Sequence, residues 1–304
     1  MRNAFANYLN KIAQNDKDLM LLVGDIGFRI FDKFRENHEE KFLNCGIAEQ
    51  NMISVAAGMA SEGKRPIIYT IIPFLLMRAY EQIRVDIGIN NEPVMLVGVG
   101  GGLSYDKLGS THHSYEDICL MRTIPNMDIF TPYDPNSTVL CSQLGYNNLI
   151  KGRSSYIRLS KGGEPNLEVK QNLSQFISLI CGELNAKNII ITHGAITYQL
   201  TKIVRESNKD ICLLSILSFD IDVIKKLLLL LNDTPKENNL IIVEENFRIG
   251  GLFEFLSVEM MNLNMLRKIK SLTLPQKYIF DIYDREILLQ RSGISKENIE
   301  RLLI

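Results

Sequence analysis

Short apolar runs alternate with amphipathic stretches along the chain. Residues 19–23, 66–72 and 94–99 are apolar enough to form buried strands. Residues 48–62 and 75–89 lie between these runs and have the spacing of helices. A series of strands that each lead into a helix predicts a parallel sheet covered by helices on both faces.

A polar stretch interrupts this pattern, which then restarts. Residues 161–175 contain two glycines and Pro165 and have no clear periodicity. Three further strands and two further helices are expected after this stretch, at 188–192, 211–216 and 239–244 and at 195–206 and 220–231. We therefore expect two α/β domains, residues 1–165 and 183–304, joined by a linker over residues 166–182.

The composition is that of an ordinary soluble protein. Hydrophobic residues make up 46% of the chain and charged residues 23%, and the formal net charge is -1. This balance predicts neither a nucleic acid nor an anionic membrane as a partner. No apolar run is long enough to span a bilayer, and the first residues lack the apolar core of a signal peptide. The five cysteines are scattered without metal-binding or redox spacing, which favours a reducing cytoplasm.

A carboxylate lies where a predicted strand passes into a helix rich in small residues. On spacing alone, Glu49 favours the helix N-terminus through the helix dipole. The run GIAEQNM at 46–52, followed by AAGMASEGKRP at 56–66, is similar to the transketolase and deoxyxylulose-phosphate synthase family. The resemblance implies a pyrimidine-binding domain, followed by a smaller α/β transketolase C-terminal domain. It also implies that Glu49 is catalytic and binds N1′ of the thiamine aminopyrimidine.

The segment 73–84 resembles the family's aromatic wall around the aminopyrimidine ring. Phe74 matches one of the family's aromatic residues, and Ile71 and Met77 occupy the flanking aromatic positions. The resemblance implies that these three side chains bind the cofactor, through apolar contact and ring stacking. From the pattern alone, Phe74 is equally compatible with an ordinary core residue.

A glycine-rich loop carries two of the chain's four histidines. Alone, residues 98–117 are compatible with a phosphate cradle or a tight turn, and no third ligand near His112 and His113 suggests a metal site. The run from Gly109 to Thr111 and His112 matches the family's G-x-T-H motif. The resemblance implies that His112 lies over the substrate channel, with a catalytic and substrate-binding role, and His113 is the second candidate for substrate binding.

Two basic residues, Arg158 and Lys161, lie near the C-terminal end of the first domain. Lys161 follows the strand-like run at 156–159 and matches the family's sugar-phosphate-binding basic residue, and Arg158 is a second candidate. The usual ligand edge of a parallel sheet is the carboxyl end of its strands. A solvated surface lysine is the alternative for Lys161.

The family's diphosphate-binding motif, Gly-Asp-Gly followed by an Asn, is missing. Residues 24–27 (GDIG) resemble it only superficially. Since Mg²⁺ needs oxygen ligands around the phosphates, thiamine diphosphate and Mg²⁺ are expected to be held mainly by a partner chain. The resemblance implies an N-terminal transketolase subunit as that partner, in a two-plus-two heterotetramer.

Two departures from the family bear on the substrate. Transketolases have a histidine where this chain has Gly100 and an aspartate where it has Leu108. We predict a transferase that moves a two-carbon ketol unit from a ketose phosphate to an aldose in carbohydrate metabolism. The alternatives are a deoxyxylulose-phosphate-synthase-like enzyme, the beta subunit of a 2-oxoacid dehydrogenase, and a non-catalytic partner subunit. In the second domain, Asn246 replaces a family histidine, and we expect that domain to be structural and interface-forming.

Overall fold

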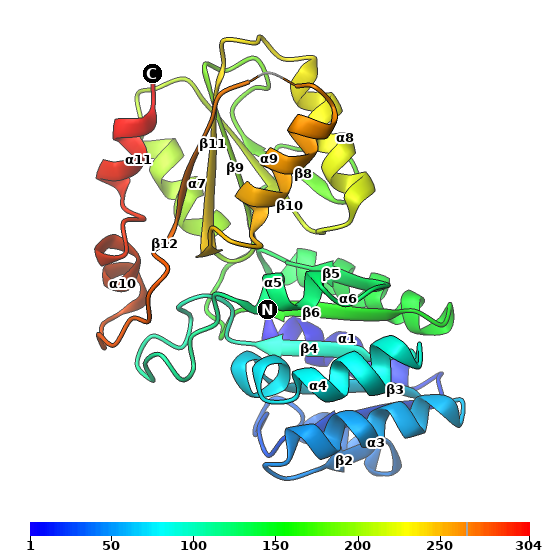
Figure 1. Cartoon of the computed structure of the whole chain (residues 1–304). Coiled ribbons are helices and arrows are strands. Elements are labelled where there is room, and N and C mark those ends of the chain that lie inside the picture. Colours follow the sequence, from blue (N-terminus) through cyan, green and yellow to red (C-terminus); the bar gives the residue numbers. More distant parts are fainter. Residues whose placement is uncertain (266) are drawn as a thin grey trace.

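The computed structural model describes residues 1–265 and 267–304. It contains two α/β domains, stacked one above the other in Figure 1. The first domain is built on a parallel sheet of order β2-β1-β3-β4-β6-β5. Its strands are β1 (Leu19–Val23), β2 (Phe42–Asn44), β3 (Arg65–Ile71), β4 (Met95–Val99), β5 (Met127–Phe130) and β6 (Ser154–Leu159).

Helices cover both faces of this sheet, as the alternating pattern predicts. Successive residues of a strand point to opposite faces, so Leu21 packs in one apolar cluster with Phe5, and Leu22 packs in the other with Met52. The helical segments are α1 (Arg2–Ala13), α2 (Asp32–Asn37), η1 (Glu39–Lys41), α3 (Glu49–Ser61), η2 (Pro73–Met77), α4 (Tyr80–Gln82), η3 (Ile83–Ile89), α5 (Asp117–Arg122) and α6 (Pro135–Ile150).

The helix expected over residues 75–89 is not a regular α-helix. The π-helical segments η2 and η3 flank the single α-helical turn α4. The wide turn is visible in the bond from the Arg78 amide to the carbonyl of Pro73, five residues earlier. π-helical segments are frequent at functional sites.

The second domain has a mixed sheet of order β12-β11-β9-β10-β8-β7. Its strands are β7 (Gln171–Asn172), β8 (Ile177–Cys181), β9 (Asn188–His193), β10 (Ile211–Ile216), β11 (Asn239–Phe247) and β12 (Ile269–Leu274). Its helices are α7 (Ile196–Glu206), α8 (Ile221–Asn232), α9 (Leu252–Asn262), α10 (Arg285–Arg291) and α11 (Lys296–Leu302). Two α/β domains are confirmed.

The expected linker needs a correction. Residues 166–182 contain β7 and β8, and β8 pairs antiparallel with β10. The second sheet therefore begins inside the stretch assigned to the linker, because the apolar run at 177–181 completes the ladder of β10.

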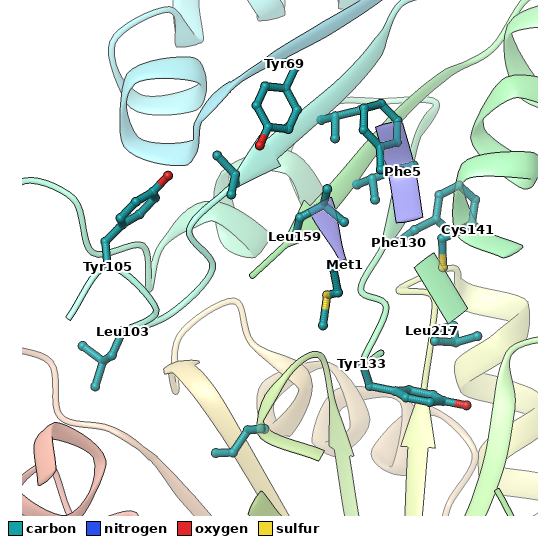
Figure 2. Close-up of a cluster of buried hydrophobic side chains, with 14 of the residues drawn as sticks. Met1, Phe5, Tyr69, Leu103, Tyr105, Phe130, Tyr133, Cys141, Leu159 and Leu217 are labelled. Atoms are coloured by element: carbon teal, nitrogen blue, oxygen red, sulfur yellow. The ribbon is translucent and has the colours of Figure 1, made fainter. Parts of the chain in front are cut away.

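The two domains are joined by backbone and side-chain contacts. The Thr131 amide donates to the carbonyl of Leu217 at 2.9 Å, and the Phe219 amide donates to Ile129 at 3.1 Å. Figure 2 shows Phe130, Tyr133 and Leu217 in the same buried cluster. Within the described ranges, no helix is both long and apolar enough to cross a membrane.

Candidate active site

The predicted site segments converge on one edge of the first sheet. The parallel strands β2, β3, β4 and β6 end there, and the segment after each strand carries a predicted site residue. These residues are, in the same order, Glu49, Phe74, His112 and Lys161. The carboxyl edge of a parallel sheet is where ligands of α/β proteins bind.

Glu49 is a buried carboxylate with a partner that the sequence analysis missed. It is the first residue of α3 and is 2% exposed. Its Oε2 accepts a hydrogen bond from Nη1 of Arg78 at 2.7 Å. The guanidinium of Arg78 also lies 4.5 Å from the centre of the Phe74 ring. The π-helical turn brings Arg78 to this position.

The rings of Phe74, His112 and Tyr105 form a row between Glu49 and Lys161. The rings of Phe74 and His112 meet edge to face with centres 5.1 Å apart, and His112 lies 5.9 Å from the ring of Tyr105. Nζ of Lys161 lies 5.5 Å from the centre of the Tyr105 ring. Burial lowers the pKa of His112, so its imidazole is neutral at pH 7. The carboxylate of Glu49 therefore lies at one end of the row and the ammonium group of Lys161 at the other.

The remaining cofactor-binding candidates flank this row. Ile71 and Met77, like Phe74, are only half-buried, so their side chains are accessible to a ligand. A buried carboxylate beside three accessible apolar side chains fits the aminopyrimidine half of thiamine diphosphate. Among the described residues, no group of three or more acidic, histidine or cysteine side chains is arranged to hold a metal ion.

A pocket of about 710 Å³ lies around Lys161 and is also lined by Arg2 and by Arg285, which is paired with the buried Glu245. Nζ of Lys161 is 3.9 Å from Asp106, and the side chain of Lys161 is about half exposed. Arg2 lines the same pocket, and its Nη2 is 3.6 Å from the place of a Cβ at Gly162. No sequence motif surrounds Arg2, so only the fold reveals it as a candidate phosphate ligand.

Arg158 does not face the site, contrary to the sequence-based expectation. It is 6% exposed, and its Nε donates to Oδ2 of Asp117 at 2.7 Å. Its Nη2 donates to the carbonyls of Ser114 and Glu245, at 3.0 and 3.2 Å. As part of β6, Arg158 points into the domain interface, where it joins the two domains and is closed to a sugar phosphate.

His113 also turns into the interior. Its ring is 2% exposed, and its Nδ1 lies 2.8 Å from the hydroxyl of Tyr115. His112 ends a turn in which its amide donates to the carbonyl of Gly109, and of the two histidine rings only that of His112 contacts Phe74 and Tyr105. The expected contact of His113 with substrate is therefore not supported by its position. A hydrogen bond from the second domain also stabilises this loop, because the side-chain amide of Asn246 donates to the carbonyl of Tyr115 at 3.1 Å.

The comparisons with known proteins point to one family. Residues 1–163 match the family model of the transketolase pyrimidine-binding domain. The chain is 28% identical, over 98% of its length and 96% of the relative, to one subunit of the apulose-4-phosphate transketolase of Phocaeicola vulgatus. It is 29% identical to 1-deoxy-D-xylulose-5-phosphate synthase of Clostridium perfringens, and it covers 48% of that protein.

A solved structure shows the same fold. It is described as a split-gene transketolase in an inactive beta4 tetramer. The TM-score is 0.77 at 23% identity, and the match covers 99% of this chain and 95% of the other. Together with the family match, these similarities confirm the predicted family. The chain belongs to the transketolase family and corresponds to its separate C-terminal subunit.

Proposed function

We propose that this chain is the aminopyrimidine-binding subunit of a two-chain transketolase that depends on thiamine diphosphate. The enzyme transfers a two-carbon ketol unit from a ketose phosphate to an aldose. The observation that carries this proposal is the row from buried Glu49 through Phe74 and His112 to Lys161. It offers an acid for the cofactor ring at one end and a cation for a phosphate at the other.

Each residue of the row has a defined task. Glu49 exchanges a proton with the ring nitrogen N1′. Phe74, Ile71 and Met77 orient the ring through apolar contact. The neutral His112 donates or accepts a hydrogen bond at the reacting end of the sugar. Lys161 and Arg2 bind the sugar phosphate through charge-assisted contacts. When bound, thiamine diphosphate supplies the nucleophilic carbon of the reaction.

A partner chain completes the site in this proposal. It carries the diphosphate-binding domain with its Mg²⁺, and the two chains form a two-plus-two heterotetramer in the cytoplasm. Two observations support the partner. The relative that matches the chain end to end is named as a subunit, and the synthase relative is about twice as long as this chain.

The donor is a ketose phosphate other than the usual xylulose 5-phosphate. Gly100 has no side chain to hydrogen-bond a donor hydroxyl, and Leu108 cannot accept a hydrogen bond. The relative acts, by its name, on apulose 4-phosphate, which is therefore the first donor to test here. Synthase activity on pyruvate is the second candidate, supported by the 29% identity to the Clostridium protein.

Reconstitution tests the proposal. Three samples are assayed: the chain alone, a subunit that carries the diphosphate-binding domain alone, and their mixture. Each receives thiamine diphosphate, Mg²⁺, an aldose acceptor and either a ketose phosphate from a panel or pyruvate. We expect ketol transfer by the mixture only, and weak cofactor binding by the isolated chain in calorimetry. Micromolar or tighter binding of thiamine diphosphate by the isolated chain contradicts the partner model. Turnover of pyruvate but of no ketose phosphate as the donor favours the synthase.

A further inference from the structure

Tyr105 fills the space above Gly100. Both residues belong to the loop between β4 and α5. A Cβ at Gly100 would lie 2.5 Å from Cε2 of Tyr105, far inside van der Waals contact, and Gly100 has a φ of +108°. Residue 100 therefore has no room for a side chain while the Tyr105 ring is in place. Tyr105 takes over the part of the site that a side chain at position 100 would reach.

The phenol hydroxyl of Tyr105 is available as a hydrogen-bond donor. The residue is 8% exposed, and its hydroxyl is neither bonded to another described residue nor sealed from solvent. Figure 2 shows Tyr69 and Tyr105 in the same buried cluster. Burial raises the pKa of Tyr105, with a smaller opposing effect of Arg2, so the group is a neutral O–H donor at pH 7.

The position of Tyr105 in the row determines which part of a sugar it reaches. The centre of the Tyr105 ring lies 5.9 Å from that of His112 and 5.5 Å from Nζ of Lys161. In the proposed function, His112 serves the reacting end of the sugar and Lys161 its phosphate. Tyr105 contacts both of these residues, so its place in the row corresponds to the middle of the sugar chain, where ketose phosphates differ in the position of their hydroxyls.

We propose that Tyr105 contacts the donor and determines its specificity, with the phenol O–H donating a hydrogen bond to an oxygen in the middle of a ketose phosphate. This inference rests on the proposed function and adds the group that distinguishes one ketose phosphate from another. A site built around a substrate oxygen discriminates strongly against analogues that cannot pair with it.

Tyr105→Phe in the reconstituted two-chain enzyme tests this proposal, because it keeps the ring above Gly100 and removes only the hydroxyl. Tyr198→Phe, on α7 of the second domain, is the matched control. We expect Tyr105→Phe to lower kcat/KM for the best ketose phosphate by about 10-fold or more, the range of one lost hydrogen bond to substrate. The same change should alter the ratio of kcat/KM between two ketose phosphates that differ in a middle hydroxyl. The affinity for thiamine diphosphate and the KM of the aldose acceptor should stay at wild-type values.

The outcomes separate the two proposals. If the wild-type enzyme turns over ketose phosphates and Tyr105→Phe has the same kcat/KM and donor preference, the role of Tyr105 is wrong and the proposed function stands. If the wild-type enzyme turns over no ketose phosphate, both are wrong. An equal loss for all donors, accompanied by weaker thiamine diphosphate binding, also overturns the specificity role, since it indicates a damaged site.

Discussion

Oε2 of Glu49 accepts a hydrogen bond from Nη1 of Arg78 at 2.7 Å, at the open edge of the first sheet. Glu49 is almost fully buried, whereas the Arg78 side chain is 43% exposed. A buried carboxylate is costly without a partner, so Arg78 stabilises Glu49 in the free chain. Because Arg78 reaches solvent, it is free to move aside when a ligand atom takes over the contact with Glu49.

Glu49→Gln should abolish turnover in the reconstituted enzyme. The amide is nearly the same size as the acid but cannot exchange a proton with a ring nitrogen, so we expect kcat to fall by ~100-fold or more. Glu62→Gln, at the exposed C-terminal end of the same helix, is the control and should leave kcat unchanged. Steady-state kinetics measure the loss, and size-exclusion chromatography shows whether the variant still assembles with its partner. Nearly full activity of Glu49→Gln would assign the proton exchange to another group.

Local motifs explain why much of the site was predictable. Glu49, Phe74, His112 and Lys161 each lie in a short run that follows a strand, and parallel strands bring such runs to one edge. Arg2 has no such motif, because its place depends on the packing of α1 against α6, far later in the sequence.

Arg158 shows the converse error. Its spacing from Lys161 suggests a shared task, but a strand alternates its side chains between two faces. Position 158 therefore points to Asp117 in the domain interface.

The fold class was predictable from the alternation of strands and helices, but the start of the second sheet was not. The run at 177–181 is apolar and short, and it follows a polar segment that resembles a linker. Its strand character comes from antiparallel pairing with β10, more than thirty residues later. Such a non-local partner leaves no trace in the local pattern.

Gly102 should be far less tolerant of a side chain than Gly63. Both have positive φ, +63° and +82°, but a Cβ at Gly102 would lie 2.5 Å from Cγ of Glu245, and a Cβ at Gly63 would meet nothing within 4 Å. Gly63→Ala should cost about 1–2 kcal/mol of unfolding free energy, from backbone strain alone. Gly102→Ala also displaces Glu245 from its buried pair with Arg285 and should cost about 3 kcal/mol or more. Urea unfolding of the isolated chain measures both, and equal losses would show that Glu245 adapts without leaving Arg285.

His113 should make the chain less stable at acidic pH. Burial lowers its pKa below the ordinary value of 6.5, and Glu245 and Asp106 only partly oppose this effect. Between the folded and unfolded pKa values the unfolded chain binds more protons, so stability falls as pH drops below about 6.5. The stability difference between the wild type and His113→Gln should therefore become less favourable to the wild type from pH 7.5 to pH 5.5. Urea unfolding at each pH measures this difference.

A difference that is constant with pH would contradict the effect assigned to His113. An NMR titration of the His113 ring in the wild-type chain provides a second check that does not depend on the variant folding. We expect its protonation midpoint to lie below that of histidine in an unfolded peptide, about 6.5.

Lys161→Ala should weaken the binding of phosphorylated donors without altering the chemistry. Nζ of Lys161 lies 3.9 Å from Asp106, and its half-exposed side chain can approach a phosphate in the pocket. A cation that contacts the phosphate equally in the ground state and the transition state affects KM and leaves kcat unchanged. We therefore expect KM for ketose phosphates to rise by ~10-fold or more, in line with the loss of one charge-assisted contact. An unphosphorylated ketose should show no such change. Lys151→Ala, at the exposed C-terminal end of α6, is the control.

An unchanged KM in Lys161→Ala, together with a raised KM in Arg2→Ala, would show that Arg2 and not Lys161 contacts the phosphate, because both cations line the same pocket.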